Sequence, residues 1–245
     1  MISLWEIWAT RHDAGAVPGD DAWDAAAAGV RNGWHQGDLI VFAPDWIDPV
    51  GRLHLGDLIG LDMAGRMDAA RYARIWELSI RGARAPETAG LEPVESVDHG
   101  GVTVRRYEQP AAHVSADLVT LAPTLRGDAR PTVELAEVGF APHRCLQLAP
   151  PPWRPTVMTF PGVMLGGELV GYAGIADVFT RRDVRSPGYI AVGVDGTLVG
   201  FAAPGVDDGW VRFAGATPPG PHDVTVIVLA TDRDRRICFA AEARR

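Results

Sequence analysis

The N-terminal third of the chain alternates between helical and strand-like patterns of hydrophobic residues. Apolar side chains recur every three or four positions from 20 to 34, which predicts a helix. We expect Asp20 and Asp21 to cap this helix and Asn32–Gly33 to end it. Its apolar face consists of Trp23, Ala27, Val30 and Trp34.

A short apolar run and a second helical pattern follow. The run DLIVF, bounded by Gly37 and Pro44, predicts a buried strand. Residues 60–74 return to helical spacing, and IWELSI at 75–80 alternates as a second strand with Trp76 on its apolar face. The order helix, strand, helix, strand predicts a parallel strand pair with a right-handed crossover.

From about residue 94 the period becomes two. Gly100–Gly101 separates two strand-like arms, and Asp195–Gly196 suits the type I′ turn of a hairpin. With that turn we expect one buried face to hold Ile190, Val192, Val194, Val199 and Phe201. The runs WVRFAG, VTVIVLA and RICFAA supply further strands, and the proline-rich segment 148–155 is too short for a free linker.

These patterns predict an α+β protein in which a small α/β unit precedes an antiparallel β-sandwich of jelly-roll type. We place the α/β unit at residues 1–90, a β-rich connector at 91–129 and the β-sandwich at 130–245.

Composition narrows the possible functions. The net charge of −8 argues against general binding to nucleic acid or anionic membrane. All 23 basic residues are arginine, so lysine Schiff-base and Walker-type chemistry are excluded. No apolar run approaches the roughly 18–20 residues of a membrane span, so we expect no direct membrane insertion. The N-terminus MISLWEIWATRHDAG is a poor signal peptide, and export would require a longer protein.

Motifs for common chemistries are missing from the sequence. It contains no dinucleotide-binding glycine motif, P-loop, nucleophile elbow or zinc-protease helix. No two histidines are four residues apart, and the pair His143 and Cys145 is a weak metal signal. We therefore predict no cofactor and no metal, and an enzyme is the less favoured interpretation.

Two polar clusters are candidates for ligand binding. Residues 43–57 read as one loop after a strand, where Asp45, Trp46, Arg52 and His54 could bind a polar ligand or perform acid–base chemistry. The alternative is that the acidic residues cap turns and Arg52 pairs with a nearby carboxylate. The second cluster, with Asp208, Trp210 and Arg212, is either a turn or a carbohydrate contact.

Two segments carry a resemblance to known families. DAWDAAAAGVRNGWHQGDLIVFAPDW followed by RIWELSI, within residues 20–82, resembles the extracytoplasmic C-terminal region of polytopic glycosyltransferases. These are polyprenyl-phosphate-sugar-dependent enzymes of the protein mannosyltransferase and aminoarabinose transferase type. The second half resembles galactose-binding-like jelly-roll modules, through residues 166–177, 194–196, 209–210 and 224–230.

The resemblance implies an accessory role without catalysis. Those transferases keep their catalytic acidic residues in loops attached to membrane helices, which this sequence lacks, so no catalytic residue is carried over. The implied function is an extracytoplasmic, periplasmic-side domain that accompanies a membrane glycosyltransferase and binds a glycan. The alternatives are a small enzyme acting on a sugar or phosphorylated substrate at the 43–57 loop, a structural subunit, and a cytoplasmic location.

Cys145 and Cys238 are either two buried small hydrophobic residues or one disulfide. In a jelly roll the first and last strands commonly lie side by side, and the two cysteines occupy runs at those places. The resemblance therefore predicts that the two sulfur atoms are neighbours. A disulfide would persist only outside the reducing cytoplasm.

Overall fold

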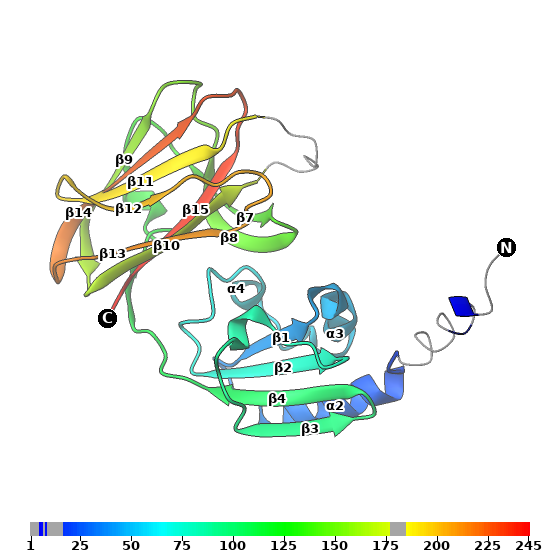
Figure 1. Cartoon of the computed structure of the whole chain (residues 1–245). Helices are drawn as coiled ribbons and strands as arrows, with labels where there is room; N and C mark the ends of the chain where they lie inside the picture. Colours follow the sequence, from blue (N-terminus) through cyan, green and yellow to red (C-terminus); the bar gives the residue numbers. More distant parts are fainter. Residues whose placement is uncertain (1–4, 7, 9–16, 177–184) are drawn as a thin grey trace. The chain divides into compact units, whose positions relative to one another are not determined.

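The computed structural model describes all residues except 1–4, 7, 9–16 and 177–184, so most of the N-terminal run considered as a signal peptide and Asp177 lie outside the described residues. The chain divides into two compact units. The first comprises Met1–Met63 and Asp68–Ala111, and the second comprises Ala64–Met67 and Ala112–Arg245. Figure 1 shows a helix-containing unit and a unit built almost entirely of strands.

The predicted first helix is present as α2, Asp20–Gly33. Its buried residues are Trp23, Ala26, Ala27 and Val30, as the apolar spacing indicates. The capping prediction is wrong: Gly19 occupies the N-cap, and Asp20 and Asp21 lie in the first turn. Their carboxylates remain favourable there because the helix N-terminus carries partial positive charge.

The first unit contains a four-stranded sheet of order β1-β2-β4-β3, whose strands are β1 Leu39–Ala43, β2 Arg74–Ile80, β3 Glu95–His99 and β4 Val102–Glu108. β1 and β2 pair in parallel as predicted, and the other pairs are antiparallel. Gly100 and Gly101 both have positive φ and form the β3–β4 turn. These two strands complete the first sheet, although the sequence places residues 91–129 in a connector.

The segment that connects β1 to β2 contains different helices from those that the sequence predicts. Residues 43–57, expected as a loop, form the 3-10 helix η1, Asp45–Ile47, and the helix α3, Asp48–Leu55. The helix expected over 60–74 is reduced to α4, Leu61–Ala64.

The reason for the shortened helix lies in the second unit, to which Ala64–Met67 belongs. The carbonyl oxygens of Gly65, Arg66 and Met67 accept hydrogen bonds from the Arg144 amide, the His143 ring and the Trp210 indole. A continuing helix would need these carbonyls for its own backbone, so tertiary contacts override the helical spacing.

Two buried carboxylates organise the first unit. Asp38 accepts hydrogen bonds from the His35 amide, the Trp76 indole and the Arg74 guanidinium. Burial alone raises the pKa of Asp38, but these donors outweigh it and hold the pKa below its usual value.

Glu77, which is fully buried on β2, is the second of these carboxylates. One of its oxygens accepts bonds from the Ala85 amide at 2.8 Å and the Thr88 hydroxyl at 2.5 Å. The other oxygen pairs with Arg105 at 2.8 Å. Both residues are fully satisfied in structural roles, as buried charges must be.

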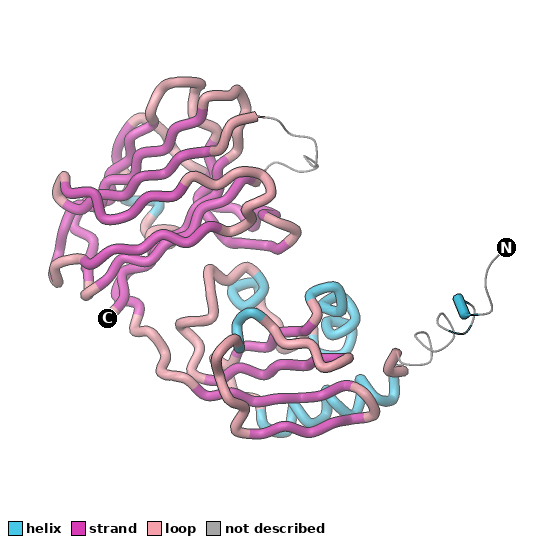
Figure 2. Tube along the Cα trace, viewed as in Figure 1, coloured by secondary structure: helices cyan, strands magenta, loops and turns pink. Residues whose placement is uncertain are grey.

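The second unit is an antiparallel β-sandwich, as predicted, with few helical residues (Figure 2). One sheet has the order β13-β10-β15-β8-β7, with β5 also pairing to β15, and the other has the order β12-β11-β14-β9-β6. Its strands are β5 Val114–Asp117, β6 Arg126–Gly127, β7 Thr132–Val138, β8 Ala141–Leu148, β9 Thr156–Leu165, β10 Glu168–Ile175, β11 Gly188–Val194, β12 Thr197–Ala202, β13 Val211–Ala216, β14 Gly220–Ala230 and β15 Ile237–Arg244.

The hairpin of β11 and β12 turns at Asp195–Gly196, both with positive φ, as expected for a type I′ turn. The predicted register is wrong beyond the turn. A bulge between Val192 and Gly193 shifts the pairing, so that Val192 faces Gly200 and Phe201 is 55% exposed. Slipping by one residue moves a side chain to the other face of the sheet.

Cys145 and Cys238 form a disulfide with a Cα–Cα separation of 5.6 Å, which confirms that the sulfur atoms are neighbours. The cysteines lie on the adjacent strands β8 and β15, but diagonally, because Cys238 pairs directly with Gln147. β8 is an interior strand between β7 and β15 and is not the first strand of the sandwich.

In the described part of the chain, no helix is both long and apolar enough to cross a membrane. The same residues contain no group of three or more His, Cys, Asp or Glu side chains arranged to hold a metal ion.

Candidate functional site

The structure separates the residues of the first predicted cluster. Arg52 pairs with Asp48 one helical turn earlier, at 2.5 Å, and both side chains are partly exposed. The His54 ring is 2.8 Å from an Asp24 oxygen and stacks with Trp23 at a centroid distance of 6.0 Å. The first contact lies within α3, and the second joins α3 to α2 through a His54 side chain that is mostly buried.

Asp45 and Trp46 begin η1 directly after β1, where a ligand could approach the carboxyl end of the parallel strands. Trp46 is 60% exposed. Arg52 and His54 pair with other carboxylates, so the structure does not gather the four predicted residues around one point.

The second predicted cluster is divided between a turn and a packed face. Asp208 accepts a hydrogen bond from the Gly205 amide at 2.8 Å, and Gly209 follows with positive φ, so Asp208 shapes a turn. Arg212 lies 3.4 Å from Glu168 on the neighbouring strand, with both side chains about half exposed.

Trp210 stacks with two other rings. It stacks with His143 at 4.4 Å and with Tyr172 at 6.0 Å between centroids, and its indole N–H donates to the Met67 carbonyl at 3.1 Å. Burial lowers the pKa of His143 below its usual value, although the contact with the Arg66 carbonyl opposes this. These contacts favour an anchoring role for Trp210, since its ring faces and its N–H are engaged within the unit.

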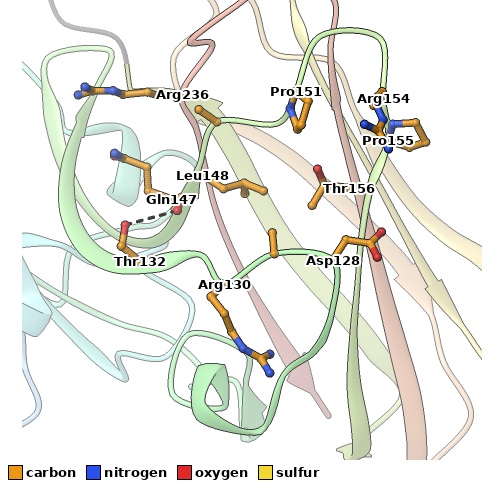
Figure 3. Close-up of a pocket in the computed structure, with 12 residues that line it drawn as sticks. Asp128, Arg130, Thr132, Gln147, Leu148, Pro151, Arg154, Pro155, Thr156 and Arg236 are labelled. Atoms are coloured by element: carbon orange, nitrogen blue, oxygen red, sulfur yellow. Dashed lines mark hydrogen bonds between the residues drawn. The ribbon is translucent and has the colours of Figure 1, made fainter.

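A groove of about 650 Å³ lies at one end of the sandwich (Figure 3). Its lining comes from the places where β6 and β8 end and where β7, β9 and β15 begin. We call it the end groove. Its lining residues are Asp128, Ala129, Arg130, Thr132, Gln147, Leu148, Ala149, Pro151, Arg154, Pro155, Thr156 and Arg236.

The end groove combines apolar and polar surface. Leu148, Pro151 and Pro155 supply the apolar part, and the hydroxyls of Thr132 and Thr156 are among the polar groups. Figure 3 shows these side chains around the depression, with Gln147 beside Thr132. Its lining is therefore suited to a ligand that has both apolar faces and hydroxyl groups.

Next to the groove, Trp153 has an unusual backbone conformation. Its φ is +61°, and it is the third residue of a turn closed by the Arg154 amide and the Pro151 carbonyl at 3.2 Å. Positive φ at this turn position favours Gly or Asn and costs a bulky residue of order 1 kcal/mol.

No packing gain offsets this strain. The Trp153 side chain is 75% exposed, while its amide is fixed to the Ala230 carbonyl at 2.8 Å. Pro152 and Pro155 restrict the backbone on either side. An exposed indole on a strained and hydrogen-bonded backbone position is a candidate ligand contact, because strained residues cluster at functional sites.

Sequence reasoning missed the end groove because its residues come from three separate segments, 128–132, 147–156 and 236. One local signal was present: a tryptophan within the proline-rich run 148–155. By its composition alone, that run indicates only a segment too short for a free linker.

No protein-family model matches this chain, and no curated protein matches it significantly. Among solved structures, the C-terminal CBM6 module of the laminarinase LamC from Zobellia galactanivorans gives a TM-score of 0.28 at 12% identity, covering 39% of this chain and 87% of the other. The secreted serine protease VesC from Vibrio cholerae gives 0.35 at 10% identity, covering 68% and 42%. The CBM51-2 and INT domains of Clostridium perfringens ZmpB, in complex with GlcNAc, give 0.35 at 15% identity, covering 61% and 36%.

Proposed function

We propose that the β-sandwich is a non-catalytic glycan-binding domain that holds its ligand in the end groove. The observation that carries this proposal is Trp153, an exposed indole held at positive φ beside the groove. An indole face stacks on the apolar face of a pyranose ring, while side-chain hydroxyls and amides hydrogen-bond to the sugar hydroxyls.

The groove supports binding more than catalysis. Among its lining residues only Asp128 carries a carboxylate, and that group accepts a hydrogen bond from the Val157 amide at 3.3 Å. Most glycoside hydrolases use two facing carboxylates, one as the acid and one as the base or nucleophile. The end groove provides one.

The disulfide and the sequence resemblance support an extracytoplasmic location for the domain. A bond between Cys145 and Cys238 is stable in an oxidising compartment, which favours the extracytoplasmic side. Residues 20–82 resemble the extracytoplasmic region of membrane glycosyltransferases that use polyprenyl-phosphate sugars. We therefore propose that the domain accompanies such a transferase and presents or retains its glycan.

Titration of the protein with a panel of neutral and acidic envelope oligosaccharides tests this proposal. Tryptophan indole signals in NMR report binding, and we expect a dissociation constant on the order of 0.1–1 mM. Trp153→Ala should abolish binding. Trp46→Ala, which removes another exposed indole from the first unit, is the matched control and should leave binding unchanged.

Two outcomes contradict the proposal. One is the absence of signal changes with every oligosaccharide in the panel. The other is binding that persists in Trp153→Ala and is lost in Trp46→Ala, which would move the site to the carboxyl end of β1.

A further inference from the structure

The charges around the end groove point to the chemical class of its ligand. Arg130, Arg154 and Arg236 line it against the single carboxylate of Asp128. The whole chain has a net charge of −8, so this local excess of positive charge runs against the average of the molecule. Such a region concentrates anions near the surface.

The positive charge is not consumed by neighbouring acids. In the described residues, neither Arg154 nor Arg236 forms an ion pair, and both side chains are exposed. Arg130 donates to the Leu125 carbonyl, a contact that fixes its position and leaves its charge uncompensated. Asp128 instead accepts its hydrogen bond from a backbone amide, that of Val157.

The arginines surround the groove and do not converge within it. Figure 3 shows Arg130 and Arg236 at opposite margins, extending away from the depression, and Arg154 beside Pro155 at a third place. A site for a single small anion would aim its donors at one point. Separated cations along a groove fit an extended ligand that carries several negative charges.

Resting on the proposed function, we propose that the ligand is an acidic oligosaccharide, whose carboxylate or phosphate substituents lie along the rim formed by Arg130, Arg154 and Arg236. Trp153 supplies the stacking surface for a sugar ring, and the arginines select chains with repeated negative charge. The apolar floor at Leu148 and the threonine hydroxyls contact the uncharged parts of the rings.

A matched ligand pair tests the proposal on the full chain. A hexamer of galacturonic acid is compared by calorimetry with its methyl ester, which has the same rings and no charge, and with inorganic phosphate alone. We expect the acid to bind about tenfold more tightly than the ester, and the difference to shrink in high salt because exposed charges are screened. Inorganic phosphate alone should bind more weakly than the hexamer.

Variants separate the charge from the stacking surface. Arg154→Gln combined with Arg236→Gln should remove the preference for the acid while leaving binding of the ester. Arg233→Gln removes an exposed charge from the same loop outside the groove and should leave the preference intact.

The outcomes distinguish this inference from the proposed function. Equal affinity for acid and ester, lost in Trp153→Ala, refutes the acidic ligand and leaves glycan binding standing. Phosphate that binds as tightly as the hexamer also overturns the inference, since it would indicate a simple anion site. Binding of neither hexamer, together with no binding across the oligosaccharide panel, overturns both.

Discussion

Asp38 holds together residues that are far apart in sequence. Its side chain, in a residue that is 5% exposed, accepts bonds from the Trp76 indole and the His35 amide at 2.9 Å each and pairs with Arg74. Because its pKa is lowered in the folded state, it stabilises the fold above its ordinary pKa, and that stabilisation is lost as the pH falls through the lowered value.

Replacement of Asp38 by Asn should therefore be costly. The change leaves the Arg74 charge without its partner, and we expect the free energy of unfolding to fall by about 3 kcal/mol. Urea unfolding followed by tryptophan fluorescence measures it. Asp48→Asn, which breaks the partly exposed pair with Arg52, is the control and should cost under about 0.5 kcal/mol. Equal costs for the two variants would show that the Asp38 network contributes nothing special.

Two histidines should make stability depend on pH in opposite directions. The pKa of His143 is lowered mainly by burial, so protonation opposes folding and stability falls as the pH drops below about 6.5. The pKa of His222 is raised mainly by its hydrogen bond to Asp195, at 2.6 Å. Its contribution is present below the unfolded pKa and is lost as the pH rises through the folded one.

Melting temperatures measured between pH 5 and pH 8 test this pair. His143→Phe keeps a ring against Trp210 and should flatten the loss of stability on the acidic side. His222→Gln should leave that acidic loss unchanged and remove the small decline toward neutral pH. An acidic loss that is identical in wild type and His143→Phe would assign it to other groups.

At the scale of the strands, two glycines leave room for the Phe213 ring inside the sandwich. A Cβ atom at Gly171 on β10 would lie 2.2 Å from the Phe213 ring, and one at Gly200 on β12 would lie 2.7 Å from it. β10 and β12 belong to different sheets, so these glycines make room for one aromatic ring between the two layers.

We expect Gly171→Ala to lower the free energy of unfolding by about 1–3 kcal/mol, since the Phe213 ring must move in a packed core. Gly167→Ala is the matched control: no atom lies within 4 Å of a Cβ there, and its φ is not positive. Thermal unfolding of the two variants gives the comparison. A Gly167→Ala variant that is the less stable of the two would refute the packing argument.

Sequence patterns predicted most elements, and the exceptions have local physical causes. The burial of α2, the parallel pair and both glycine turns follow from periodicity and turn chemistry. The β11–β12 register failed because one bulge residue is invisible to a period-two count. The end groove could not be predicted for another reason: its lining comes from three distant segments, which no local pattern connects.

At the scale of the whole molecule, the disulfide links strands that are 93 residues apart. In the chain-entropy model, closing such a loop stabilises the fold by about 4–5 kcal/mol, less any strain. We expect protein purified from an oxidising compartment to show no free thiols in denaturant and to melt at a lower temperature after reduction. Two reactive thiols under those conditions would contradict the disulfide and remove its support for an extracytoplasmic site.

The segment Ala64–Met67 has a consequence for how the molecule can be divided. These four residues belong to the sandwich unit, Asp68–Ala111 belong to the first unit, and the rest of the sandwich unit begins at Ala112. A fragment that starts at residue 112 would therefore lack part of the second unit. In that fragment the Trp210 indole would lose its contact with the Met67 carbonyl, and the His143 ring its contact with the Arg66 carbonyl. Each unit is compact, but the two are interleaved in sequence. Dividing the chain at any single position therefore leaves at least one unit incomplete.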